Sequence, residues 1–116
     1  MLQKLSAVIP CDSSGVYLTK IFSIYQRPIA KVGTFAKISV KLAKPKAKLR
    51  KKKKSKIFVV RTVYQMMLAD TSCYVYSRNN ALTIKKRLQV RGRAIFGPTT
   101  YTIKRKKFLK SFVRVL

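Results

Sequence analysis

The sequence predicts a mainly β protein, a small closed β-barrel or sandwich built as one domain over residues 1–116. Three observations support this fold class. Short segments with alternating or β-branched apolar residues recur along the chain, and Gly, Pro and Asn residues separate them. The chain of 116 residues is long enough for one domain with one core and too short for two, and 47% of its residues are apolar. Closure into a barrel would also remove exposed sheet edges.

Three segments in the first half of the chain have strand patterns. MLQKLSAVIP, which ends at Pro10, is too short and too polar for a secretory signal and is interpreted as a first strand. KIFVVRTV, residues 56–63, is mostly β-branched and aromatic, as in a strand covered on both sides. In TFAKISVKL, residues 34–42, apolar and polar residues alternate, which predicts a strand with a basic, wet face and a buried face. The buried face would hold Ala36, Ile38, Val40 and Leu42.

Shorter strands are predicted in the second half. CYVYS at 73–77 follows a predicted turn at 69–72, in which Asp70 would bond the backbone ahead, and NALTI at 80–84 is the next strand. IFGPTT at 95–100 closes the set. Its Gly-Pro pair is interpreted as a turn, because Pro98 fixes its own backbone and forces Gly97 away from helix.

The carboxyl-terminal segment changes period. After Tyr101, apolar residues recur at helical spacing with Lys and Arg between them, which predicts a short amphipathic helix over 103–114. Its apolar stripe comprises Phe108, Leu109, Phe112, Val113 and Leu116. That stripe would either plug the end of a barrel or fit the groove of a partner.

The charge balance points to a polyanionic partner. The chain has 28 Lys and Arg against two acidic residues, Asp12 and Asp70, and a formal net charge of +26. A compact body with so much positive charge needs negative charge from outside, and nucleic acid supplies it densely. An acidic membrane surface is the rival polyanion, although no window approaches the roughly 18 apolar residues of a spanning helix.

The composition nearly excludes catalysis and metal binding. With no His and only two acidic residues, the chain offers almost no general acid or base and too few metal ligands, so no catalytic residue, metal or cofactor is predicted. Cys11 and Cys73 fit no metal spacing. They could form one disulfide, but buried thiols in a reducing compartment are the favoured interpretation.

The densest charge lies in KPKAKLRKKKKSK, residues 44–56, between two predicted strands. This segment is predicted to be a basic hairpin arm, reaching about 20 Å if extended, or a flexible loop that binds phosphates. A second patch lies at 85–93 and a third on the final helix, and charge on several sides favours folded RNA over a DNA duplex. The candidate RNA-binding residues are Lys37, Lys41, Lys44, Lys46, Lys48, Arg50, Lys51, Lys52, Lys53, Lys54, Lys56, Arg61, Lys85, Lys86, Arg87, Arg91, Lys104, Arg105, Lys106 and Lys107.

Several motifs, in order and over nearly the whole chain, resemble the universal large-subunit ribosomal protein fourteen family. The start MLQ and the turn DSSG, from Asp12 to Gly15, are similar to the family's opening. VGTFAKISV from Val32 is similar to its next strand, and Val-Val-Arg-Thr at 59–62 is unchanged. Asn80-Ala81, GRAIFGPT at 92–99 and the Lys-Phe-x-Lys pattern at 107–110 complete the resemblance.

The resemblance implies a five-stranded β-barrel with a projecting ribbon and one or two short carboxyl-terminal helices. It implies binding to large-subunit ribosomal RNA, contact with ribosomal proteins three and nineteen, and one face exposed to small-subunit RNA and to a ribosome silencing factor. That exposed face would carry Gly92, Arg93, Ala94 and Lys110, and the structural turns would be Asp12, Gly15, Gly97 and Pro98.

Departures from the family pattern suggest where the protein works. Thr34 and Thr102 replace acidic residues of the family, the last family residues are absent after Leu116, and lysine outnumbers arginine, as A-rich coding would favour. The start matches the family's own start and leaves no room for a transit peptide. A protein encoded inside a mitochondrion fits these features, and the cytoplasm of a bacterium or another organelle is the alternative.

Two other functions remain open at this point. One is a stand-alone RNA- or DNA-binding barrel that acts off the ribosome. The other is a cationic protein bound to acidic lipid. Sedimentation with or without large ribosomal subunits would separate them.

Overall fold

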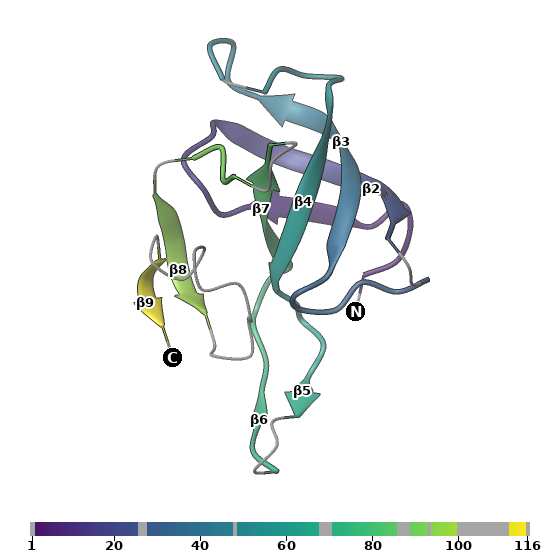
Figure 1. Cartoon of the computed structure of the whole chain (residues 1–116), viewed down its shortest axis with the longest axis vertical. Coiled ribbons are helices and arrows are strands. Elements are labelled where there is room, and N and C mark those ends of the chain that lie inside the picture. The colour runs from purple at the N-terminus through teal and green to yellow at the C-terminus, as the bar shows by residue number, and fades with distance from the viewer. Residues whose placement is uncertain are drawn as a thin grey trace.

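Five strands close into a barrel in the computed structural model of the chain (Figure 1). They are β1 (Ala7–Pro10), β2 (Val16–Ile24), β3 (Phe35–Ala43), β4 (Lys54–Arg61) and β7 (Asn80–Ile84), paired in the order β1-β2-β3-β4-β7. The structure describes residues 2–25, 28–47, 49–67, 71–85, 89–92, 94–99 and 112–115. The parallel pairing of β1 with β7 closes the barrel, and its other pairs are antiparallel. The predicted five-stranded β-barrel is confirmed.

Two small sheets extend from the barrel. Strands β5 (Met66–Met67) and β6 (Cys73–Tyr74) form an antiparallel hairpin that projects beyond the end of β4 (Figure 1). Strand β8 (Ile95–Thr99) pairs in parallel with β9 (Phe112–Val115) at the side of the barrel. The strand predicted at 73–77 is therefore shorter than expected, and neither it nor β8 belongs to the barrel.

Two apolar clusters lie on opposite faces of β4. Ile57 and Val59 point into the barrel core, whereas Phe58 and Val60 join a second cluster with Leu82 and Ile95 that holds β8 against the barrel. A strand buried on both faces needs consecutive apolar residues. This confirms the interpretation of 56–63 as a strand covered on both sides.

The burial of β3 departs from simple alternation at one end. Ala36, Ile38 and Val40 are fully buried as predicted, but Leu42 is 51% exposed. In the pairing with β2, Leu18 faces Leu42 and Thr19 faces Val40, so β3 carries one extra residue at this point. Such a bulge reverses the facing of later side chains. Ala43 then packs against the core in place of Leu42.

The described residues of the basic segment 44–56 form a folded loop up to Lys53 and the start of β4 from Lys54 on, and the projecting ribbon lies elsewhere. Turns close at 44–47 and 50–53 through backbone bonds of 3.0 and 3.2 Å, and the Lys52 N–H donates to the Val40 carbonyl oxygen at 2.9 Å. Leu49, 5% exposed, packs in the barrel core. One buried leucine therefore ties the loop to the barrel, and the projecting hairpin is β5–β6.

Two predictions for the end of the chain need correction or lie outside the described residues. Gly97 and Pro98 were predicted to form a turn, but both lie inside β8, where Gly97 has a φ of +87° and the register with β9 shifts. The helix predicted over 103–114 falls mostly outside the described residues. At its end, residues 112–115 form the strand β9.

Candidate nucleic-acid interface

Lysines and aromatic rings share the outer face of strands β2, β3 and β4. Phe22 and Tyr25 come from β2 and the residue after it, Lys37 from β3, and Lys54 and Lys56 from β4. We call these five residues the lysine–aromatic face. All are exposed except Lys56, which is half-buried.

The strand period and register bring these lysines together. Because side chains alternate along β3, burial of Ala36 and Ile38 turns Lys37 outward. The β3–β4 register places Lys37 directly opposite Lys56 and Ser39 opposite Lys54. Like charges directly opposite each other in a sheet are destabilising. The pairing of Lys37 with Lys56 is therefore electrostatically unfavourable in the isolated protein.

Each lysine of the face lies against an aromatic ring. The Nζ atom of Lys56 is 4.9 Å from the ring centroid of Tyr25 and that of Lys37 is 5.4 Å from it, and the Lys54 Nζ lies 5.5 Å from the ring centroid of Phe22. Cation–π contacts at exposed sites are worth about 0.5–1 kcal/mol each. They offset part of the repulsion but leave the net charge unchanged.

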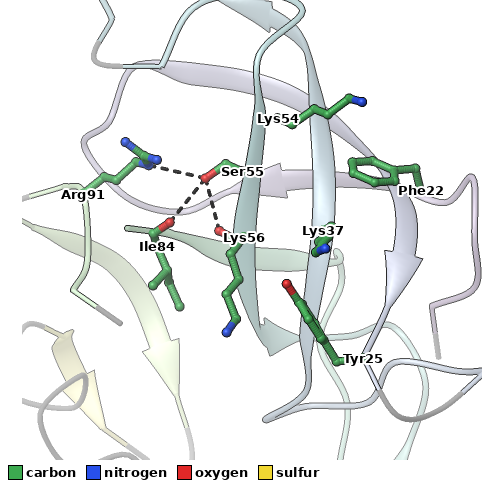
Figure 2. A pocket seen from close by; sticks show the side chains of 8 residues that line it. All are labelled: Phe22, Tyr25, Lys37, Lys54, Ser55, Lys56, Ile84 and Arg91. Carbon is green, nitrogen blue, oxygen red and sulfur yellow. Dashed lines mark hydrogen bonds between the residues drawn. The ribbon is translucent and has the colours of Figure 1, made fainter. Parts of the chain in front are cut away.

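The lysine–aromatic face encloses a groove of about 560 Å³ (Figure 2). Its far wall is formed by Arg91, whose Nε donates to the Ser55 hydroxyl at 3.3 Å, and by Ile84. The Ser55 hydroxyl in turn donates to the Ile84 carbonyl oxygen at 3.3 Å. This chain of bonds holds the arginine against the barrel.

Asp12 is fully engaged elsewhere. One carboxylate oxygen accepts hydrogen bonds from the Ser14 N–H and hydroxyl at 3.3 and 2.6 Å, and the other accepts from the Thr83 N–H and hydroxyl at 3.1 and 2.7 Å. The side chain is buried and joins the β1–β2 turn, which also contains Gly15, to β7. It is therefore a structural residue of this turn and does not neutralise the lysine–aromatic face.

Most of the predicted RNA-binding residues within the described part of the chain are on the surface. Lys56 and Arg91 are half-buried and line the groove. The exposed ones are Lys37, Lys41, Lys44, Lys46, Arg50, Lys51, Lys52, Lys53, Lys54 and Lys85. Those that lie outside the described residues are Lys48, Lys86, Arg87, Lys104, Arg105, Lys106 and Lys107.

Arg61 does not fit its predicted role. It is 8% exposed, and its guanidinium donates to the carbonyl oxygens of Phe96 at 2.8 Å and Pro98 at 3.3 Å. A Cβ atom at Gly97 would overlap this guanidinium. Arg61 therefore links β4 to β8 inside the fold. The absence of a side chain at Gly97 leaves space for its guanidinium.

The segment predicted to face the small subunit packs on the β1–β2 turn. Ser13 and Ala94 exchange hydrogen bonds, N–H to carbonyl at 3.1 Å and N–H to hydroxyl at 3.2 Å. A Cβ atom on Gly92 would lie 2.8 Å from the Ser13 nitrogen. Gly92 thus permits close packing of this segment on the turn. Arg93 and Lys110 lie outside the described residues.

The two cysteines are free thiols in different environments. Cys11 is buried, and burial raises the pKa of its thiol to about 11 despite the opposing charge of Arg61. Cys73 is exposed on the β5–β6 hairpin, contrary to the expectation that both thiols are buried. In the part of the chain that the structure describes, no helix is long and apolar enough to cross a membrane.

Sequence reasoning missed strand β2 and with it the aromatic half of the face. The usable signal was the interleaving of Tyr17, Lys20, Phe22 and Tyr25 in residues 16–25, because basic and aromatic side chains that alternate on a strand suit nucleic acid. The β2–β3 register shifts at three points, and two of these shifts insert an extra residue into β2 and break its period. That break hides the strand from a search for strict alternation.

Comparison with known proteins gives matches that span nearly the whole chain. A family model described as ribosomal protein L14p/L23e matches residues 1–114. A protein of Tetrahymena pyriformis named large ribosomal subunit protein uL14m is 32% identical over 115 residues, which cover 97% of this chain and 97% of that protein.

Proposed function

Because the chain belongs to the ribosomal protein L14p/L23e family, we infer that it is a structural, non-catalytic component of the large ribosomal subunit and binds the RNA of that subunit. The observation that carries the RNA-binding part is the lysine–aromatic face. Its lysines converge without a carboxylate from Asp12 to neutralise them, and their rings offer stacking surfaces. Phosphates and unstacked bases supply what this face lacks.

We assign RNA contacts to two surfaces. One is the lysine–aromatic face with Arg91, and the other is the folded loop at 44–53 with its exposed lysines. The basic residues outside the described part of the chain, at 86–87 and 104–107, are proposed to add further RNA contacts. Arg61 is left out because its guanidinium is used inside the fold.

Sedimentation of tagged protein from a lysate tests the main function. We expect co-migration with large subunits at low salt and loss of that association as salt rises, because phosphate contacts release counterions. Migration with free RNA or DNA at the top of the gradient would indicate a stand-alone nucleic-acid-binding protein. Flotation with membranes would indicate an acidic-lipid binder. Either result would overturn the proposal.

The segment at 92–94 and Lys110 are proposed to face the small subunit or a silencing factor. Support comes from Gly92 and Ala94, which pack on the β1–β2 turn. The double change Arg93→Ala with Lys110→Ala should leave incorporation into large subunits intact and weaken subunit joining or factor binding. Loss of incorporation with normal joining in the remaining particles would place these residues against large-subunit RNA.

We propose that the protein works in a mitochondrial ribosome, beside ribosomal proteins three and nineteen. The support is the name of the Tetrahymena relative and the loss of acidic residues from the chain. Locating the coding sequence tests the proposal, because a bacterial gene would contradict it.

A further inference from the structure

The groove beside β4 combines stacking surfaces with cations in a way that the loop lysines do not. Phe22 and Tyr25 are 37% and 38% exposed, so each side chain keeps part of its surface accessible at the groove. Figure 2 shows Lys54 extending toward Phe22, and Arg91 reaching toward Ser55 from the opposite side of the groove. The volume of about 560 Å³ lies within the range of small-ligand sites.

We propose that this groove holds one unpaired nucleotide of the RNA, with its base stacked on Tyr25 or Phe22 and its phosphate between the groove lysines and Arg91. The proposal rests on the proposed function, because it names the part of the RNA that the lysine–aromatic face recognises. The proposal gives the groove a different role from the loop at 44–53, because the loop lysines would contact phosphates of any RNA.

The cation–π contacts explain how the rings would become available. Lys37 and Lys56 both lie over the Tyr25 ring, and Lys54 lies over that of Phe22. A lysine ammonium sits on a flexible four-carbon stem and holds an exposed ring only weakly. An arriving base can replace the ammonium on the ring while the ammonium moves to the phosphate of the same nucleotide. Both groups then keep a partner.

In addition to these lysines, Arg91 gives the groove a cation that is held by hydrogen bonds. Its Nε bond to Ser55, and the Ser55 bond to the Ile84 carbonyl, anchor the guanidinium to the paired strands β4 and β7. A planar guanidinium held in this way suits a phosphate better than a free lysine does.

A paired base does not fit these observations. In an RNA duplex each base is covered by its neighbours above and below, so its face cannot reach a ring in a groove. A nucleotide in a bulge or loop can be splayed out, and base–aromatic stacking tolerates any base because every base has a π-face. The groove should therefore select for an unpaired position more than for a particular base.

The test compares two RNA hairpins that share one stem, one fully paired and one with a single-nucleotide bulge. Binding of the full-length protein is measured at moderate salt, with 2-aminopurine in the bulge to report stacking. We expect about tenfold or tighter binding of the bulged hairpin, the size of one base–aromatic stack. Tyr25→Ala should reduce this preference, and the double change Phe22→Ala with Tyr25→Ala should abolish it. Tyr25→Phe should keep it.

Matched variants separate the groove from general charge. Tyr17→Ala removes an exposed tyrosine of the same strand, with its own lysine 5.9 Å from the ring centroid, but outside the groove, and should keep the preference. Lys54→Ala should reduce the preference, whereas Lys51→Ala on the loop should lower binding to both hairpins equally. Circular dichroism of each variant confirms that it is folded.

Equal binding of both hairpins by the unchanged protein would overturn the proposal, as would an undiminished preference in the folded double variant. Tight binding of a free nucleoside monophosphate without a bulge preference would make the groove a small-molecule site and would also overturn it. Co-sedimentation with large subunits is scored separately. A protein that co-sediments but shows no bulge preference refutes the groove proposal alone.

Discussion

The roles of some single residues in this fold depend on tertiary contacts that cannot be recognised in the sequence. Alternation predicted the burial of Ala36, Ile38 and Val40, because facing on a strand depends only on local period. It could not separate Arg61, which is internal, from the exposed lysines, because its partners Phe96 and Pro98 are far along the chain. A lone charged residue in an apolar run is the available signal for such an internal role.

Replacing Gly97 should be costly through Arg61. Gly97→Ala adds a methyl group against the guanidinium and also strains a φ of +87°. Gly33 has the same φ of +87° with open space around its missing Cβ, so Gly33→Ala measures the backbone strain alone. We expect a loss of about 1–2 kcal/mol in unfolding free energy for Gly33→Ala and about 1–3 kcal/mol more for Gly97→Ala, since a charged, buried donor loses its acceptors. Denaturant unfolding of both variants checks this, and equal losses would show that Arg61 adjusts freely.

The two thiols should differ in reactivity and in their effect on pH stability. At pH 8 an alkylating reagent should modify Cys73 first, because the raised pKa of Cys11, about 11, lowers its thiolate fraction roughly a hundredfold. The native state holds this proton more tightly than the unfolded state. The stability it contributes is therefore complete below about pH 9 and is lost as pH rises through about 11. Cys11→Ala should flatten the pH dependence there relative to Cys73→Ala. Equal labelling of both thiols in the folded protein would contradict the assignment.

Secondary-structure elements were predicted correctly where their sequence pattern was regular. They were missed where a bulge or a contact with a distant residue determined their conformation. Residues 80–84 form β7 with the predicted bounds. β2 was overlooked because two bulges break its period. The segment 44–56 was expected to be an arm or a flexible loop, yet Leu49 turns it back onto the core. One apolar residue in a run of lysines is a weak local signal with a large effect on the element.

The loop lysines should act as phosphate contacts independent of RNA sequence. Replacing Lys51, Lys52 and Lys53 with Ser should lower the affinity for any RNA and reduce the slope of log affinity against log salt by about 0.7–0.9 for each lysine that contacts a phosphate. The three side chains are exposed and leave Leu49 in place, so the fold should survive. The same positions changed to Arg keep the charge and should keep the slope. An unchanged slope in the Ser variant would show the run to be solvated.

At the scale of the whole molecule, composition bears on the kind of partner more directly than on the fold. A net charge of +26 with two acidic residues indicated a polyanionic partner before any strand was placed. The structure adds that the carboxylate of Asp12, one of those two residues, accepts hydrogen bonds from Ser14 and Thr83. The position of the groove could not be predicted, because it depends on the register that sets Lys37 beside Lys56.

The isolated chain should be poorly folded or poorly soluble at low ionic strength, and RNA should stabilise it. Positive charges that repel each other in the native state gain from counterions or phosphates. Saturating RNA at about 100 times its Kd adds about 2.7 kcal/mol, enough to raise Tm by roughly 10 °C or more for a domain of about this size. Thermal melts with and without RNA, at low and high salt, measure this.

A substitution within the lysine–aromatic face isolates the cause of this instability. Lys37→Gln removes the charge opposite Lys56 and should raise the low-salt Tm, because a directly opposed like-charge pair costs roughly 0.2–1 kcal/mol. Lys41→Gln removes one charge from the same strand beyond the β3–β4 ladder, which ends at Ser39, and should raise it less. The same Lys37→Gln change should weaken RNA binding, since that lysine lines the groove. A sharp thermal transition at about 60 °C at low salt without RNA, unchanged by either substitution, would show that the fold is stable despite its net charge and needs no partner.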